Sequence, residues 1–319
     1  MVVSRQGNVV GEGAHRRPGT PHAETYALEM AGPEARGGTI YVTLEPCSFS
    51  GRTPPCVEAI IAAGVSHVVV AVEDPDSRVA GTGMRALRDA GLTVEVGMLG
   101  AEVEEIDPAY FHHRRTGLPR VTYKAALTLD GSVAALDGSS QWISGESARR
   151  DVHQLRGSVD AVVIGSGTAN SDDPLLNARY DHQGPQPRPV IVTGESKLSP
   201  QLRIWEMNPL VVATRAEEHP GGEMLVVDGP EGRPDPTATA SALADEGYLD
   251  LLLEGGPALA GSWWRAGLIS RGVFYLGAKV GGGRGINPIA GEFMSLDDAR
   301  AITIESVERL GPDLKVVFS

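Results

Sequence analysis

The residues best suited to catalysis lie near the start of the chain. His22 and Glu24 begin an alanine-rich segment, Cys47 follows an apolar run, and Cys56 follows two prolines; the 319 residues include only these two cysteines. Two thiolates and one imidazole bind Zn²⁺ and leave the fourth tetrahedral position to water, as in catalytic zinc sites. Glu24 can carry protons between that water and a leaving amine, as in nucleobase deamination. We therefore predict a catalytic zinc site; the alternative is two buried thiols and a surface histidine.

The composition limits where such chemistry can act. Hydrophobic residues make up 41% and charged residues 22% of a chain whose net charge is −13. These values indicate a globular protein and argue against the basic groove that nucleic acids need. The sequence has no apolar run long enough for a membrane span, and residues 1–5 lack the pattern of a signal peptide. Since both cysteines are assigned to the metal, we expect a cytoplasmic protein without a membrane partner.

The sequence around these residues alternates between strand and helix patterns, and these elements would have to bring the residues together. Apolar, β-rich runs predict strands at residues 39–44, 67–72 and 92–99, and helical patterns fall at 23–31, 56–63 and 83–90. The stretch 111–119 is basic and is broken by Gly117 and Pro119, so we place a domain boundary at about residue 117. We interpret His112 and His113 in this stretch as solvated linker residues rather than metal ligands.

The second part of the chain also alternates strand and helix patterns, which predicts another layered α/β domain with a mostly parallel sheet. Domains of this class usually bind ligands at the carboxyl ends of their strands. Helices are expected at residues 146–155, 237–245 and 258–267, and a closing hairpin at 301–307 and 314–318. The other strands are expected at 121–129, 161–165, 189–192, 210–213, 225–227, 249–253 and 272–276.

Glycine-rich loops follow several of these strands. The loops at residues 165–168, 254–257 and 281–285 could present backbone N–H groups to an anion, although tight turns or a mobile surface loop also explain the glycines. Arg156 and Arg179 could each grip a phosphate through two hydrogen bonds. A Gly-x-Gly-x-x-Gly motif with a following acidic residue is absent, so a standard Rossmann site is not supported. The residues therefore predict binding of a phosphorylated small molecule.

Longer motifs connect both halves to a known family. The first half contains, in order, Gly11-Glu12-Gly13-Ala14-His15, Pro21-His22-Ala23-Glu24, Thr43-Leu44-Glu45-Pro46-Cys47 and Gly51-Arg52-Thr53-Pro54-Pro55-Cys56. The second half contains Lys124, Leu129-Asp130-Gly131, Ser140-Gln141-Trp142-Ile143, Ala148-Arg149-Arg150-Asp151-Val152, Asp172-Asp173-Pro174 and Glu254-Gly255-Gly256-Pro257. Over nearly its whole length the chain resembles the bifunctional deaminase/reductases of riboflavin biosynthesis.

The resemblance implies a cytidine-deaminase-like three-layer α/β domain at residues 1–117 and a dihydrofolate-reductase-like domain at 118–319. The first would use Zn²⁺, held by His22, Cys47 and Cys56, with Glu24 as the catalytic residue, to deaminate a diaminopyrimidinone that carries a phosphoribosylamino group. The second would reduce the ribosyl side chain to ribityl with NADPH. The resemblance places the cofactor on Ala126, Trp142, Thr168, Asp172, Gly256, Pro257, Ala258, Leu259, Ala260, Gly261 and Ser262. It places the reductase substrate on Ser140, Arg156, Leu176, Arg179 and Glu254, and it implies a homo-oligomer, either a dimer or a tetramer.

The chain also departs from the family pattern. It starts inside the expected first strand, so we expect an amino-terminally truncated deaminase domain with weak or absent activity beside a near-normal reductase. Ser48-Phe49-Ser50 stands where a histidine is usual, and Asp76-Ser77 replaces Asn-Pro. One alternative is a reductase whose first domain is only a zinc-stabilised structural or oligomerisation module. A deaminase acting on nucleotides or polynucleotides is disfavoured by the acidic charge and by the second domain.

Overall fold

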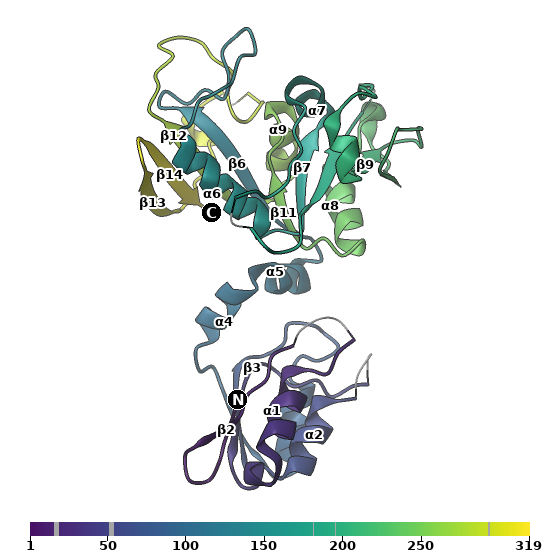
Figure 1. Ribbon diagram of the computed structural model, residues 1–319, viewed down its shortest axis with the longest axis vertical. Coiled ribbons are helices and arrows are strands. Elements are labelled where there is room, and N and C mark those ends of the chain that lie inside the picture. Colours follow the sequence, from purple (N-terminus) through teal and green to yellow (C-terminus); the bar gives the residue numbers. More distant parts are fainter. Residues whose placement is uncertain (16–18, 51–53, 181, 195, 293) are drawn as a thin grey trace. The chain divides into compact units, whose positions relative to one another are not determined.

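The chain forms two compact units, Met1–Thr116 and Gly117–Ser319, each with its own sheet (Figure 1). The computed structural model describes residues 1–15, 19–50, 54–180, 182–194, 196–292 and 294–319. The Gly51-Arg52-Thr53 part of the cysteine motif therefore lies outside the described residues. None of the described helices is long and apolar enough to cross a membrane.

The first unit is built on a five-stranded sheet with the order β2-β1-β3-β4-β5. Its strands are β1 (Val2–Val3), β2 (Val9–Gly11), β3 (Thr39–Leu44), β4 (His67–Val72) and β5 (Thr93–Val96), of which β3, β4 and β5 run parallel. Its main helices are α1 (Ala23–Ala31), α2 (Cys56–Ala63) and α3 (Thr82–Asp89). All three helices bury side chains in one core with Val68 and Val70, which point to the same face of β4.

The end of the first unit is helical, so the prediction of a solvated linker is wrong. Helices α4 (Gly100–Ile106) and α5 (Pro108–Thr116) occupy this segment. The ring of Phe111 is buried, and the guanidinium of Arg115 lies 5.5 Å from its centroid while pairing with Glu104 of α4 at 2.6 Å. The basic residues that suggested a linker, including His113, form the last turn of α5, where cations are favoured by the helix dipole.

The second unit contains a nine-stranded sheet with the order β10-β9-β8-β7-β11-β6-β12-β14-β13. Neighbouring strands from β10 to β12 are parallel, and β14 is antiparallel to both β12 and β13. The strands are β6 (Arg120–Thr128), β7 (Ala161–Gly165), β8 (Arg188–Val192), β9 (Leu210–Ala213), β10 (Glu223–Val226), β11 (Asp250–Leu253), β12 (Ile269–Gly277), β13 (Ile304–Leu310) and β14 (Asp313–Phe318). The α-helices are α6 (Glu146–Gly157), α7 (Ser166–Asp172), α8 (Pro236–Asp245) and α9 (Pro257–Arg265). Short 3₁₀ turns in the chain are η1 (Gly32–Ala35), η2 (Arg203–Met207), η3 (Pro230–Gly232) and η4 (Leu296–Asp298).

Helices cover both faces of this sheet. Val163 of β7 shares a core with Leu243 of α8, whereas its neighbour Ile164 shares a core with Ala169 of α7. Because adjacent strand residues point to opposite faces, α7 and α8 lie on opposite sides of the sheet. Helix α6 packs through Val152 against β12 and β14. The domain is therefore a layered α/β structure, as predicted.

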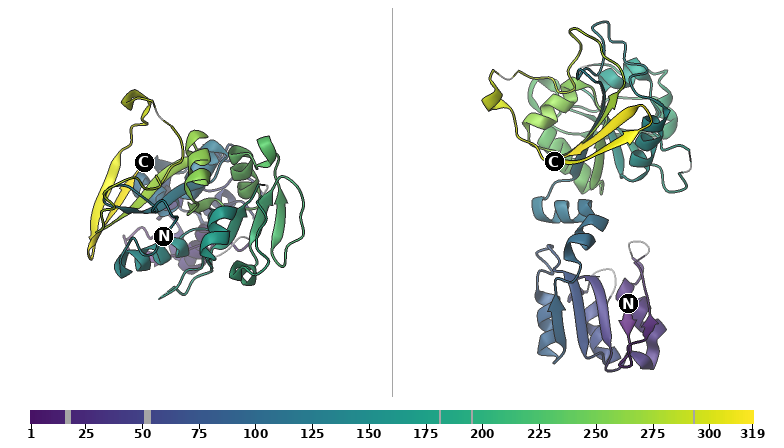
Figure 2. Two further views of the ribbon diagram at one scale, coloured as in Figure 1. Left: turned by 90° about the horizontal axis from the view of Figure 1, so that it is seen from above. Right: turned by 90° about the vertical axis from the view of Figure 1, so that its left-hand side faces the viewer.

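Most predicted elements are confirmed within a few residues. The strands at 39–44, 67–72, 161–165 and 210–213 and the helices at 23–31 and 56–63 have the predicted bounds. Helices α8 and α9 begin one residue earlier than predicted, at Pro236 and Pro257, because proline is well accommodated at the first helical position. The β13–β14 hairpin, drawn in yellow in Figure 2, confirms the predicted closing hairpin. Helix α7 forms where the sequence predicted a glycine loop.

Candidate active sites

Three elements of the first unit bring the predicted zinc ligands together. His22 precedes α1, Cys47 follows β3, and Cys56 is the first residue of α2. His22 Nδ1 lies 3.1 Å from Cys56 Sγ and 3.6 Å from Cys47 Sγ, and all three ligand atoms lie within 4.8 Å of one another. Within the described part of the chain, this is the one group of side chains placed to hold a metal ion.

The donor set fits zinc. Bonds of about 2.0–2.1 Å to nitrogen and about 2.3 Å to sulfur place tetrahedral ligands roughly 3.5–3.8 Å apart. The separations of 3.1 and 3.6 Å are close to this range. Three protein ligands leave one position for water or substrate, so the cluster of His22, Cys47 and Cys56 is a zinc site of the catalytic type.

The two sulfur atoms differ in acidity, and Glu24 lies beside them. A hydrogen bond from the Cys56 thiol, together with the Cys56 amide, lowers the pKa of Cys47 to about 6. The hydrogen bond to Cys47, followed by burial, raises the pKa of Cys56. The negative charge of Glu24 close to Cys56 adds to this increase in pKa. Glu24 is in the first turn of α1, so the predicted proton carrier lies next to the predicted metal position.

Helix α3 supports the loop that carries Cys47. Glu45 is buried, and its carboxylate accepts the N–H of Met84 at 3.0 Å, near the start of α3. Gly83 packs so closely on Pro46 that a Cβ at this position would clash with the Pro46 carbonyl. The sequence motif contains Glu45, but its role as an anchor depends on a contact 39 residues away.

Arg78 contacts two of the residues that depart from the family pattern, Phe49 and Asp76. The guanidinium of Arg78 binds the Asp76 carboxylate at 2.5 Å and lies 5.5 Å from the centroid of the Phe49 ring. The hydrogen bonds from Arg78 lower the pKa of Asp76 to about 2. The carboxylate that replaces the usual asparagine is therefore neutralised locally.

The second unit contains a cavity of about 730 Å³, within the usual range of about 300–1,000 Å³ for ligand pockets. It lies at the carboxyl ends of the parallel strands β7 and β11, where ligands are expected in such sheets. All predicted substrate residues line it, namely Ser140, Arg156, Leu176, Arg179 and Glu254. The predicted cofactor residues that line it are Ala126, Trp142, Thr168, Asp172, Gly256 and Pro257.

The other predicted cofactor residues, Ala258, Leu259, Ala260, Gly261 and Ser262, are not among the described residues that line the cavity. They continue along α9, where Ala260 is buried and Gly261 packs against Ala290. Only the beginning of this segment reaches the cavity. There the Thr168 hydroxyl accepts the N–H of Gly256 at 3.1 Å and joins the loops after β7 and β11.

The glycine loop at 281–285 binds a carboxylate of the protein itself. The N–H groups of Gly281 and Gly282 donate to Asp130 at 3.1 and 2.8 Å. Its glycines are not among the described residues that line the cavity. The contacts therefore give no support to the anion-loop alternative, because Asp130 already accepts the N–H groups of Gly281 and Gly282.

A buried ion cluster lies in the cavity wall. The Glu254 carboxylate pairs with Lys124 Nζ at 3.1 Å and with Nε and Nη2 of Arg156 at 2.6 and 3.0 Å. Burial alone would raise the pKa of Glu254, but Arg156 and Lys124 overcome this effect and hold the pKa well below its usual range. One edge of the Arg156 guanidinium is thus occupied by Glu254, which the sequence did not predict.

Lys124 and His153 also line the cavity, although no role was predicted for either residue from the sequence. Lys124 lies in the middle of β6, an interior strand of the sheet. Lysine is rarely buried unless it is paired, so a lysine in this strand pattern was a sequence signal for a functional site. His153 of α6 lies 3.0 Å from the carbonyl oxygen of Asn177. Burial, followed by the charge of Arg156, lowers the pKa of His153 to about 4. A single histidine on a helix gives no comparable sequence signal.

The cavity is cationic although the protein is acidic. Its lining includes five cationic and three acidic side chains: Lys124, Arg149, Arg156, Arg179 and Arg203 against Asp172, Asp173 and Glu254. The net charge of the whole chain is −13. Local cations focus the electric field in a cavity, so this site favours an anionic ligand.

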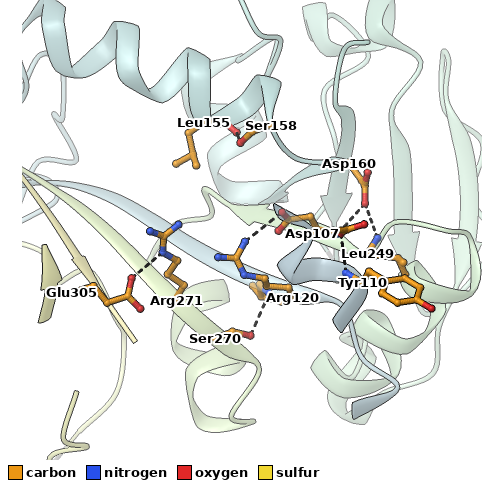
Figure 3. A network of polar contacts seen from close by, with 12 residues as sticks. Asp107, Tyr110, Arg120, Leu155, Ser158, Asp160, Leu249, Ser270, Arg271 and Glu305 are labelled. Atoms are coloured by element: carbon orange, nitrogen blue, oxygen red, sulfur yellow. Dashed lines mark hydrogen bonds and ion pairs between the residues drawn. The ribbon is translucent and has the colours of Figure 1, made fainter. Parts of the chain in front are cut away.

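A structural network occupies the opposite ends of the same strands (Figure 3). Asp160 precedes β7 and accepts the N–H groups of Leu249 and Asp250 at 2.8 and 2.9 Å, which joins the starts of β7 and β11. Arg120 of β6 pairs with Asp250 at 3.4 Å. These contacts hold the amino ends of the parallel strands together, away from the cavity at their carboxyl ends.

Comparisons with known proteins place both units in one family. The family described as RibD C-terminal domain matches residues 119–316, and the cytidine and deoxycytidylate deaminase zinc-binding region matches residues 1–72. The riboflavin biosynthesis protein RibD of Escherichia coli is 36% identical over 332 residues, covering 98% of this chain and 90% of that protein. The chain belongs to the bifunctional riboflavin biosynthesis deaminase/reductases. The RibD of Mycobacterium tuberculosis H37Rv is 39% identical over 320 residues, covering 98% of this chain and 88% of that protein.

Solved structures of this deaminase/reductase family have the same fold. Acinetobacter baumannii RibD superimposes with a TM-score of 0.89 at 32% identity, covering 99% of this chain and 90% of that chain. The deaminase/reductase of Thermotoga maritima gives a TM-score of 0.88 at 30% identity with the same coverage. The predicted family and fold class are therefore confirmed. The zinc cluster and the reductase domain together imply a metal ion and a nicotinamide cofactor.

Proposed function

We propose that residues 1–117 deaminate a phosphoribosylamino-pyrimidine and that residues 118–319 then reduce its ribosyl side chain with NADPH. The observation that carries this proposal is that each unit has a site of its own. The first holds His22, Cys47 and Cys56 beside Glu24, and the second holds the cationic cavity. The family matches to both parts of the chain support the assignment.

In the deaminase unit, zinc would supply an activated water at the position that the three protein ligands leave open. Glu24 lies beside Cys56, where its carboxylate can accept a proton and return it to the departing amine. One residue can therefore serve both proton transfers.

In the reductase unit, NADPH would supply a hydride. The guanidinium of Arg149 lies over the Trp142 ring, 4.7 Å from its centroid. Because the Trp142 side chain is still 60% exposed, its ring offers a flat surface for a cofactor ring. Arg179 is exposed at the cavity and can present its guanidinium to the substrate phosphate. Arg156 contributes by holding Glu254 at the substrate side of the cavity.

Separate assays of the two steps test the proposal. Ammonia release from the pyrimidine measures the first step, and NADPH oxidation with the deaminated product measures the second. We expect both activities, with NADPH preferred over NADH. NADPH oxidation without ammonia release would instead favour the alternative in which the first domain is a zinc-stabilised structural or oligomerisation module.

Arg179→Ala should raise the KM for the pyrimidine about tenfold to over a hundredfold, because losing a charge-assisted contact costs about 1.5–3 kcal/mol. The KM for NADPH should change little. Steady-state kinetics measure both constants, with Arg215→Ala as a control because that exposed arginine pairs with Glu217 instead. Equal weakening of both ligands would contradict the assignment of Arg179.

We also propose that the protein forms a homo-oligomer through β13. This strand is at the edge of the sheet, and its residues from Ile304 to Arg309 are all exposed. An exposed edge strand is a template for pairing with another chain. Antiparallel pairing of two copies about Val307 would place Glu305 opposite Arg309 of the second copy, so the charges of the strand favour this register.

A charge exchange in β13 tests this register. Either Glu305→Arg or Arg309→Glu should shift the protein toward monomer, because like charges would then face each other across the two-fold axis. The double variant should restore the wild-type association. Sedimentation velocity measures the distribution, and single variants that associate like the wild type would rule out this interface.

A further inference from the structure

A buried carboxylate of the reductase unit joins segments that are far apart in the sequence. Asp313 begins β14 and is 2% exposed. Its Oδ2 accepts the N–H of Gly145 at 2.6 Å, and its Oδ1 accepts the N–H of Ala278 at 3.3 Å. Gly145 precedes α6, which has no side-chain cap of its own, so Asp313 places a negative charge where the helix dipole favours one.

The same contacts fix the loop at 140–145, which carries Trp142. Gly277 packs so tightly on this loop that a Cβ there would clash with the carbonyl of Ile143. Lys279 Nζ donates to the carbonyl oxygen of Trp142 at 2.6 Å. The backbone is thus held at Trp142 and at the residues that follow it, while the ring itself is 60% exposed and lines the cavity.

We propose that Asp313 is a positioning residue for cofactor binding, which acts by holding Trp142 in the wall of the cavity. This inference rests on the proposed reductase function. It assigns a role in cofactor binding to Asp313, which is not among the described residues that line the cavity. If the loop moved, the buried Asp313 carboxylate would lose the N–H of Gly145 and keep only that of Ala278, which is unfavourable. One loop conformation is therefore preferred before the cofactor arrives, and such preorganisation improves affinity.

The test is Asp313→Asn in the zinc-loaded protein of 319 residues. The amide keeps the size of the side chain but turns a donor toward one of the two backbone N–H groups. The Kd for NADPH should rise about tenfold or more, whereas kcat at saturating NADPH should change much less. Asp160→Asn is a control at the opposite ends of the strands, where one oxygen of an exposed aspartate accepts two backbone N–H groups.

A double-mutant cycle separates positioning from a merely structural role. In a Trp142→Ala background, Asp313→Asn should change the Kd for NADPH by less than about twofold, because the side chain through which it acts is gone. An equal change in both backgrounds, or the same loss of affinity in Asp160→Asn, would overturn the inference.

Lys279→Ala gives a second route if Asp313→Asn does not fold. Lys279 is exposed, and its loss removes only the bond to the Trp142 carbonyl. The Kd for NADPH should rise several-fold in this variant and stay unchanged when Trp142 is already alanine; additive effects would overturn the inference. Wild-type protein that does not bind NADPH would refute the proposed reductase function itself, whereas tight NADPH binding that is insensitive to these substitutions would refute only the role of Asp313.

Discussion

Glu24→Gln should abolish ammonia release while the protein keeps one zinc ion per chain. The substitution removes a carboxylate beside Cys56 but none of the three metal ligands. General acid–base catalysis by a positioned side chain typically contributes about 10²–10⁴-fold in rate, so deamination should fall by at least that order. Ammonia release and elemental analysis of the same preparation measure the two properties, and NADPH-dependent reduction should persist.

Two further variants make this result specific. Glu29→Gln changes an exposed carboxylate on the same helix and should leave ammonia release unchanged. Cys47→Ser should lose zinc and activity together, because it removes a ligand. Full deamination by Glu24→Gln would show that another group carries the proton. Absence of zinc from the wild-type protein, with stability unaffected by a chelator, would contradict the metal assignment itself.

The zinc site was predictable because its ligands are rare residues at element boundaries. His22 and Cys56 lie at the starts of helices with clear apolar patterns, and Cys47 follows a strand whose bounds the sequence gives correctly. Local patterns of this kind determine where each ligand lies relative to the helices and strands. The sheet order, which no local pattern shows, then brings the ligands together; the resemblance to a known family implied only the three-layer fold.

The reductase cavity was less predictable because its key contacts join distant segments. Glu254 meets Lys124 and Arg156 across 130 and 98 residues, so nothing local distinguished Arg156 from a phosphate-binding arginine. Asp130 and Gly282 are 152 residues apart, and the N–H of Gly282 is hydrogen bonded to Asp130. Nothing local in the sequence indicates that this glycine loop binds a side chain of the protein instead of a ligand. The segment that forms α5 was predicted to be a linker because most of its residues are polar or basic. The apolar pattern of a helix was weak there, since Phe111 is its one large buried side chain among the described residues.

Glu254→Gln should strongly destabilise the second unit at neutral pH and abolish reduction. The substitution leaves Lys124 and Arg156 in the cavity wall without their anionic partner, with side chains only 17% and 12% exposed. Removing one partner of a buried ion pair typically costs about 3–5 kcal/mol in the free energy of unfolding. All four tryptophans of the chain follow residue 117, so urea unfolding followed by tryptophan fluorescence reports this unit alone. Glu146→Gln is the control, because its pair with Arg150 is exposed on α6 and should contribute less than about 1 kcal/mol.

The pH dependence of this effect distinguishes a charge from a packing role. The pKa of Glu254 is lowered in the folded state from an ordinary value of 4.5, so the ionised carboxylate binds protons less readily in the folded than in the unfolded chain. Its contribution to stability is therefore fully present above pH 4.5 and is lost as the pH falls toward the lowered pKa. The difference in unfolding free energy between the wild type and Glu254→Gln should be constant between pH 6 and 8 and should narrow progressively below about pH 4.5. A difference that stays the same at pH 3.5 and pH 7 would mean that Glu254 stabilises the unit through its shape rather than through its charge.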